Sequence, residues 1–185
     1  MFKYEKKLVY PINIKKRDLK MAKFLITQFG GPNGELGAAM RYFSQKFTMP
    51  DDKGKALLND IATEELSHVE MICTMVHQLT QNASVDELID EGLGSYYTEH
   101  GVSLFPQDSF GNPFSSSYFA STGDIIANLS EDLAAEQKAR ATYEALINET
   151  KDDDIIGPLL FLRQREIVHF NRFKELYDYY KSKGY

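Results

Sequence analysis

Apolar residues recur at intervals of three and four positions in four segments of the chain, the spacing that places them on one face of a helix. These segments cover about residues 16–46, 51–80, 124–149 and 154–182. The first is interrupted by GGPNGE, where Gly30, Gly31 and Pro32 are expected to kink or loosen the helix. Pro50 and Asp51 mark the start of the second segment.

The connections between these segments differ greatly in length. Segments one and two, and segments three and four, are joined by short links, so each pair is expected to form an antiparallel hairpin. A crossover of about residues 81–123, rich in Gly, Pro, Ser and Asn, joins the two pairs. The pattern predicts an all-α fold, a four-helix bundle made of two helical hairpins joined by a long crossover. We expect one domain over residues 1–185, with an N-terminal arm at residues 1–15.

Two of the apolar stripes contain polar residues at core positions. On the second segment the stripe runs Leu58, Ile61, Glu65, His68, Ile72, Met75, Leu79. On the fourth it runs Leu159, Leu162, Glu166, His169, Phe173, Leu176, Tyr180. Each stripe therefore carries a Glu-x-x-His pair, whose side chains lie one above the other on the helix. Because an isolated buried carboxylate is costly, these groups must be paired, protonated or bound to metal.

The two halves of the chain carry the same polar residues at a constant separation. An offset of 101 residues relates Glu35 to Glu136, Tyr42 to Tyr143, Glu65 to Glu166, and His68 to His169. One Glu-x-x-His on a helix is common without metal, but two on matching seams with two further glutamates favour a dinuclear metal site. Four inward carboxylates and two imidazoles are the ligand arrangement of ferritin-like di-iron and di-manganese bundles. Oxygen and imidazole donors without sulfur suit manganese or iron.

The other polar candidates are weaker. Tyr42 and Tyr143 are either core residues or hydrogen-bond partners of a ligand carboxylate, and we favour the second role for Tyr42. His77 lies off the seam and is expected at the surface, and His100, in the crossover, receives no role. Arg140 either balances carboxylate charge or is exposed. The run KDDDI is expected to be a solvated turn and helix start.

Charge and composition exclude several classes of protein. The formal charge of -6 argues against nucleic-acid and anionic-membrane partners, which favour basic surfaces. The single cysteine, Cys73, excludes an intramolecular disulfide and a thiolate-rich metal site. No apolar run is long enough to span a bilayer, and the N-terminus lacks an apolar signal core. A soluble protein made in the cytoplasm is expected.

Four stretches carry a family resemblance: GGPNGELGAAMRYFSQ, DIATEELSHVEMI, GNPFSSSYFASTGDIIANLSEDLAAEQKARATYE and FLRQREIVHF. Together they resemble the manganese catalase family, and most closely its short branch found in bacterial spore coats. The resemblance covers about residues 17–180. It implies a ferritin-like bundle with two manganese ions per chain that disproportionates hydrogen peroxide into water and oxygen.

The resemblance also implies individual roles. Glu35 and His68 resemble the ligands of one manganese, Glu136 and His169 match those of the other, and Glu65 matches the bridging carboxylate. Glu166 resembles an outer-sphere residue that moves protons. The two lines of reasoning conflict at Glu166, which the symmetry of the halves makes an equal of Glu65. We follow the resemblance there, and we expect Glu166 and Tyr42 to be the residues that assist catalysis.

Assembly and alternative functions follow from the same comparison. Longer manganese catalases carry a C-terminal extension that wraps neighbouring subunits in hexamers, whereas this chain ends at Tyr185. We expect some closed homo-oligomer, assembly into the spore coat and contact with other coat proteins. One alternative is a di-iron ferroxidase or rubrerythrin-like oxidoreductase, although the cysteine pairs of a rubredoxin centre are missing. Another is a mainly structural coat protein with a vestigial metal site.

Overall fold

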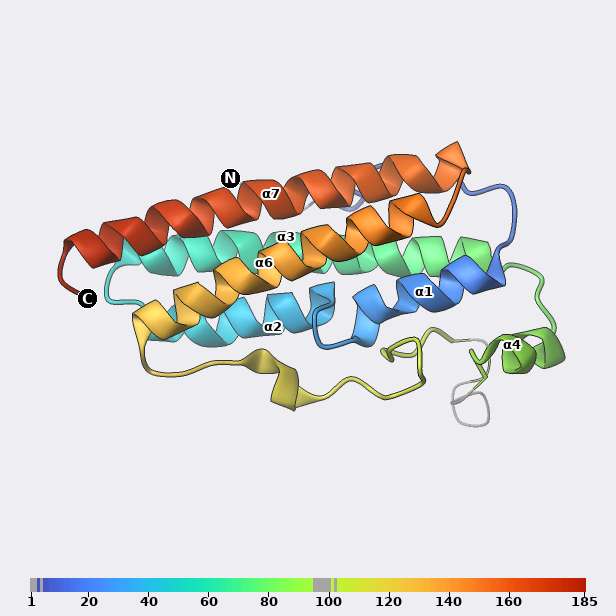
Figure 1. Cartoon of the computed structure of the whole chain (residues 1–185), viewed down its shortest axis with the longest axis horizontal. Helices are drawn as coiled ribbons and strands as arrows, with labels where there is room; N and C mark the ends of the chain where they lie inside the picture. Colours follow the sequence, from blue (N-terminus) through green and yellow to red (C-terminus); the bar gives the residue numbers. More distant parts are fainter. Residues whose placement is uncertain (1–2, 4, 95–100, 102) are drawn as a thin grey trace.

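The computed structural model describes residues 3, 5–94, 101 and 103–185. Its long helices are α1 (Leu19–Gly30), α2 (Glu35–Gln45), α3 (Asp52–Leu79), α6 (Ile125–Asn148) and α7 (Asp153–Ser182). They run side by side as an elongated bundle (Figure 1). Within the described residues the only β pairing is an isolated bridge between Gln107 and Pro113. The all-α prediction is therefore confirmed.

The first predicted segment is two helices, not one kinked helix. α1 and α2 lie end to end along α3, so that together they fill one of the four positions of the bundle (Figure 1). Gly31 ends α1 with its N–H bonded to the carbonyl of Thr27, and Gly34 is the N-cap of α2. Pro32 has no N–H to continue the helical pattern. Because the chain breaks here, Glu35 becomes the first residue of a new helix that faces the bundle interior.

The other helix boundaries follow the sequence closely. Asp51, Asp124 and Asp152 are the N-caps of α3, α6 and α7, and each accepts a backbone N–H through its side chain. Asp152, with Asp153 and Asp154 in the first turn of α7, forms the helix start that KDDDI predicts. Helices α2 and α3 pack as one hairpin, and α6 and α7 as the other.

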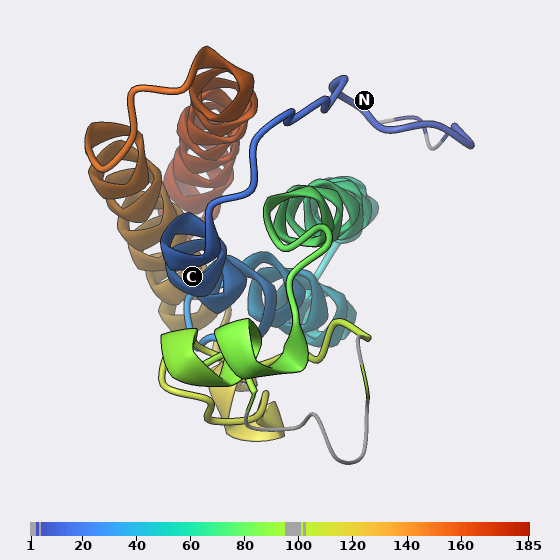
Figure 2. The same cartoon turned by 90° about the vertical axis from the view of Figure 1, so that its right-hand side faces the viewer.

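The crossover contains more structure than a loop. It includes α4 (Val85–Glu91), which a Ser84–Glu87 capping box begins, and the 3-10 helix η2 (Ser116–Phe119). Outside the crossover, a shorter 3-10 helix, η1 (Lys46–Thr48), directly follows the end of α2. α4 packs against α1, and η2 packs against α2 (Figures 1 and 2). These two parts of the crossover therefore cover the side of the bundle formed by α1 and α2. His100 lies outside the described residues.

The crossover also packs against the break between α1 and α2. A Cβ atom on Gly30 would lie 2.1 Å from the backbone nitrogen of Gln107, so that only glycine allows this approach. The break and the crossover therefore hold each other in place.

Two apolar clusters fill the bundle on either side of a polar middle layer. One cluster includes Leu25, Ile72, Met75 and Leu159, and the other includes Leu58, Ile61, Phe173 and Leu176. On α3, Ile61 and Ile72 flank Glu65 and His68, which lie between the two clusters. The apolar packing thus surrounds the polar layer and keeps it from bulk solvent.

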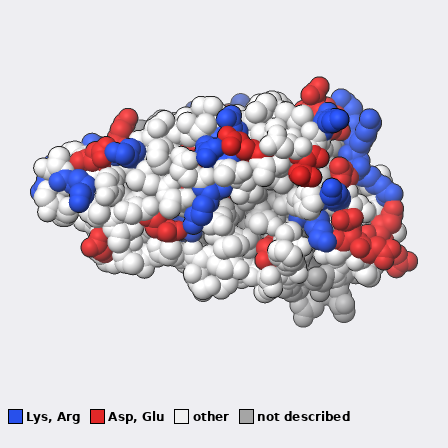
Figure 3. Space-filling view, viewed as in Figure 1, with Lys and Arg blue, Asp and Glu red and all other residues white. Residues whose placement is uncertain are grey.

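The surface carries mixed charge. On the face shown in Figure 3, acidic and basic side chains of the described residues alternate in small groups. None of the helices in the described part of the chain is both long enough and apolar enough to cross a bilayer.

Candidate metal centre

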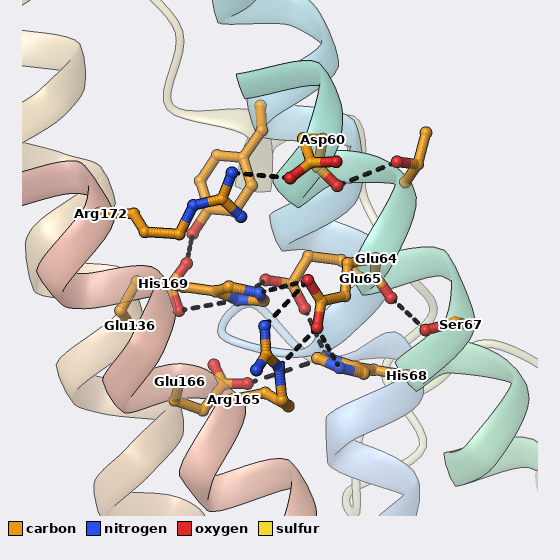
Figure 4. Close-up of polar contacts among 12 residues, drawn as sticks. Asp60, Glu64, Glu65, Ser67, His68, Glu136, Arg165, Glu166, His169 and Arg172 are labelled. Carbon is orange, nitrogen blue, oxygen red and sulfur yellow. Dashed lines mark hydrogen bonds and ion pairs between the residues drawn. The ribbon is translucent and has the colours of Figure 1, made fainter. Parts of the chain in front are cut away.

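Six polar side chains converge in the middle layer of the bundle, and Figure 4 labels all of them except Glu35. α3 and α7 supply the two Glu-x-x-His pairs, and α2 and α6 supply one glutamate each. All six side chains are buried, with at most 2% of each residue exposed: Glu35, Glu65, His68, Glu136, Glu166 and His169. The structure therefore brings together every metal-ligand candidate that the sequence predicts.

Glu65 lies between the two imidazoles. Its Oε2 atom is 2.7 Å from Nδ1 of His68, and its Oε1 atom is 2.8 Å from Nδ1 of His169. Each oxygen thus faces a different histidine, as a carboxylate that bridges two cations does. The two imidazole rings are nearly parallel, with their centroids 5.7 Å apart.

The cluster divides into two groups that could each hold a metal ion, called the metal-binding groups below. One comprises Glu35, Glu65, His68 and Glu166, and the other Glu65, Glu136, Glu166 and His169. In each group the candidate donor atoms lie within 4.8 Å of one another. Glu65 and Glu166 belong to both groups, whereas the remaining residues divide between them.

The two groups are close to symmetric. Nδ1 of His68 lies 3.6 Å from Glu35, and Nδ1 of His169 lies 3.6 Å from Glu136. The offset of 101 residues in the sequence therefore corresponds to a repeated geometry in space. Glu166 lies 3.9 Å from Nδ1 of His68 and offers an oxygen to both groups, so the outer-sphere role implied by the resemblance stays a prediction.

Burial and mutual charge shift the acid–base properties of this cluster. Burial, together with the nearby charge of Glu65, raises the pKa of Glu35 to about 7. Burial and the neighbouring carboxylates raise the pKa of Glu166 well above its usual range. Burial would lower the pKa of His68, but Glu65 and Glu35 raise it to about 9. In the metal-free protein, protons thus supply the positive charge that balances the carboxylates.

The unpartnered atoms of the cluster fit a pair of divalent cations. Buried atoms without a hydrogen-bond partner include Oε2 of Glu136 and Oε1 of Glu166. Such orphaned donors and acceptors are rare in protein interiors unless a ligand satisfies them. Carboxylate and imidazole donors without sulfur suit manganese or iron.

Each of the two site tyrosines supports a glutamate of the other hairpin. The hydroxyl of Tyr42 donates a hydrogen bond of 2.5 Å to Oε1 of Glu136, and Tyr143 donates to Oε1 of Glu35. The sequence favours such a role for Tyr42 alone, but the structure gives it to both tyrosines. These hydrogen bonds orient the glutamates and stabilise their ionised form.

The minor candidates lie away from the cluster. His77 is exposed on α3, as predicted. Arg140 is partly exposed and pairs with Glu144 at 2.8 Å, so its charge is balanced on its own helix. Cys73 is half-buried, and burial raises the pKa of its thiol to about 11.

Sequence reasoning missed three buried polar residues beside the site. Glu64 is only 4% exposed and forms an ion pair with Arg165. Burial raises the pKa of Glu64, but His169 and Arg165 outweigh this effect and lower it to about 2. Asp132 is fully buried, and both of its carboxylate oxygens lack a hydrogen-bond partner. Arg41 is 2% exposed and donates to the carbonyl of Tyr118.

A signal for Glu64 is present in the sequence. It lies four residues before His68, on the same face of the helix. The offset of 101 residues also relates it to Arg165, a residue of opposite charge. Asp132 lies one turn before Glu136, which is a weaker signal.

A four-helix bundle with four carboxylates and two imidazoles at its centre defines the ferritin-like class of dinuclear metal proteins. Within that class, the chain belongs to the family described as manganese containing catalase, whose sequence model matches residues 1–183.

Relatives and a solved structure agree with this placement. Protein CotJC of Bacillus subtilis (strain 168) is 50% identical over 182 residues, which cover 98% of this chain and 96% of the relative. A probable manganese catalase of Clostridium acetobutylicum is 36% identical and covers 100% of this chain, and 83% of its own length is matched. The crystal structure of KatB, a manganese catalase from Anabaena PCC7120, aligns with a TM-score of 0.88 at 34% identity, over 98% of this chain and 81% of KatB.

Proposed function

We propose that this protein disproportionates hydrogen peroxide into water and oxygen, with manganese ions held by Glu35, Glu65, His68, Glu136 and His169. The observation that carries this proposal is the position of Glu65, whose two oxygens lie 2.7 Å and 2.8 Å from two different histidines. Membership of the manganese-containing catalase family supports manganese over iron. The chemistry that the manganese pair supplies when bound is two-electron exchange with peroxide.

The side chains of this protein have three tasks: to bind the metal ions, to orient the ligands and to supply protons. The glutamates and histidines would hold the two cations, and Tyr42 and Tyr143 fix the orientation of Glu136 and Glu35. Glu166 is a buried carboxyl group that belongs to both metal-binding groups, and its Oε1 atom is unpartnered. Burial and the neighbouring carboxylates raise its pKa and so favour its protonated form, which suits proton transfer to and from peroxide oxygens.

The apolar clusters on both sides of the site restrict what can reach it. A buried centre of this kind admits a molecule as small as peroxide and keeps larger reductants out. This exclusion favours disproportionation over oxidation of bulky substrates.

We further propose that the protein assembles as a homo-oligomer in the spore coat, with contacts to other coat proteins. The support is its resemblance to the short spore-coat branch of the family. Immunogold labelling of sectioned spores tests the location, and label confined to the spore core would contradict it. Light scattering of the purified protein tests the assembly.

The test of activity combines metal analysis with oxygen evolution. Protein expressed with added manganese should contain about two manganese ions per chain and should release oxygen from peroxide, because the structure offers two metal-binding groups. Glu65→Ala should lose both ions and the activity. His77→Ala, an exposed histidine on the same helix, is the matched control and should keep both. Iron with oxygen consumption would indicate a ferroxidase, and bound metal without oxygen release would indicate a structural role.

A further inference from the structure

Glu64 lies on the side of the two imidazoles that faces away from the metal-binding groups. Its Oε2 atom is 3.2 Å from Nε2 of His169, and its Oε1 atom is 3.9 Å from Nε2 of His68. The Nδ1 atoms of the same rings face Glu65. In the described part of the chain, Glu64 is the only carboxylate within 4.0 Å of either Nε2 atom. One carboxylate thus faces Nε2 of both rings, and neither contact has the geometry of a hydrogen bond (Figure 4).

Arg165 holds this carboxylate from the other hairpin. Its Nε atom donates to Oε1 of Glu64 at 2.5 Å, and its second terminal nitrogen donates to Oε2 at 3.2 Å. A two-point contact of this kind fixes the plane of the carboxylate as well as its position. The guanidinium also balances a charge that would otherwise be costly to bury.

The near-symmetry of the bundle explains why one carboxylate serves both halves. Glu64 and Arg165 are equivalent residues of the two hairpins, related by the offset of 101. Equivalent residues meet where a two-fold axis passes between them, so two glutamates at these positions would repel each other. With arginine at one of them, the pair attracts, and the single glutamate lies near both imidazoles.

We propose that Glu64 is the shared positioning residue of the metal centre. With the metals bound, its carboxylate would accept the Nε2 proton of His169, 3.2 Å away, and attract that of His68 across the longer separation of 3.9 Å, which leaves both Nδ1 lone pairs directed at the metals. Histidine ligands commonly donate their second ring N–H to a carboxylate, which fixes ring orientation and increases ligand basicity. Here one carboxylate, held by Arg165, faces both rings and lies closer to His169.

The two distances predict that the halves depend on Glu64 unequally. His169, at 3.2 Å, depends on it more than His68, at 3.9 Å. The metal held by Glu136 and His169 should therefore be the first to leave when Glu64 is altered. This inference rests on the proposed metal centre.

The experiment measures manganese retention by the loaded protein and its Glu64→Gln variant in competition with a chelator. Glutamine has nearly the same size, but its single carbonyl oxygen cannot accept from both rings. We expect one manganese of the pair to be bound roughly 10- to 100-fold more weakly. The electron paramagnetic resonance spectrum should then change from that of a coupled pair toward that of a single ion.

The matched control is Glu144→Gln. Glu144 forms an ion pair with Arg163 that joins α6 to α7, at 2.9 Å and away from the metal-binding groups. This variant loses a more exposed ion pair between α6 and α7 and should keep both the manganese affinity and the spectrum of the wild type.

Unchanged affinity and spectrum in Glu64→Gln would overturn the proposal. Glu64 would then have only the structural role of linking the two hairpins through its ion pair with Arg165. If Glu64→Gln does not fold, Arg165→Gln and Arg165→Lys decide instead. The first should weaken one manganese and the second should restore much of it, since lysine keeps the charge. Unchanged retention in Arg165→Gln would then overturn the proposal. Wild-type protein that fails to bind a manganese pair would instead contradict the proposed function.

Discussion

The hydroxyl of Tyr42, on α2, donates a 2.5 Å hydrogen bond to Glu136, on α6, so that a tyrosine of one hairpin supports a carboxylate of the other. Tyr143 does the same in reverse for Glu35. The two hairpins therefore complete each other's metal-binding groups.

Removal of the hydroxyl of Tyr42 or of Tyr143 should weaken manganese binding. Tyr42→Phe leaves Glu136 without its donor, and hydrogen bonds to charged groups contribute about 2 kcal/mol. We expect manganese affinity to fall roughly 10- to 30-fold, as measured by chelator competition. The control is Tyr180→Phe, whose hydroxyl donates to Asp51 at the start of α3. That variant should lose thermal stability but retain manganese, and equal manganese loss in both variants would contradict the assigned contact.

Variants of Glu166 and Glu65 should affect different quantities: the first the rate of oxygen evolution, the second the manganese content. Glu166→Gln keeps the size of the side chain but cannot release a proton, so oxygen evolution should fall about 10²- to 10⁴-fold while manganese content stays the same. Glu65→Ala should lose both metals. Manganese loss in Glu166→Gln would show that Glu166 is a sixth ligand, as the symmetry of the two halves suggests.

Manganese uptake should release protons. In the metal-free protein the pKa of His68 is raised to about 9, so at pH 7 the ring is protonated, whereas a metal ligand must be neutral. Binding therefore expels protons, and affinity should fall as the pH is lowered. Calorimetric titrations of metal-depleted protein in buffers of different ionisation enthalpy measure the number of protons released. Heats that do not depend on the buffer would contradict this expectation.

Asp132 should make metal-free stability pH-dependent. Burial raises its pKa well above the usual range, so the folded protein keeps a proton that the unfolded chain releases as the pH rises past the ordinary carboxyl range. The contribution of this group to stability is thus largest at low pH and is lost as the pH increases. Asp132→Asn removes the carboxyl group and with it the difference in proton binding between the folded and unfolded states.

The measurement for Asp132 is urea unfolding at pH 5 and pH 8. The variant should gain stability relative to the wild type at the higher pH. Asp90→Asn, at an exposed position of α4, is the control. A difference between Asp132→Asn and the wild type that is the same at both pH values would count against a protonated Asp132.

Much of the fold could be read from the sequence because it depends on local patterns. Apolar spacing located the long helices, and the capping aspartates located their starts. At Gly30, Gly31 and Pro32 the sequence predicts a kink or a loosened helix and not a full break, because the packing of Gln107 against Gly30 comes from the distant crossover. α4 was missed because it is short and contains no fully buried residue.

By itself, the sequence determined which six polar residues converge in the middle of the bundle. Helical periodicity fixes the face on which each side chain lies, and the offset of 101 residues marks the equivalent positions of the two hairpins. Only the tertiary structure decided which residue meets which: Tyr42 with Glu136, Glu65 between both histidines, and Glu64 with Arg165. Contacts between helices depend on the relative rotation and register of the packed hairpins. No pattern within a single helix records that geometry.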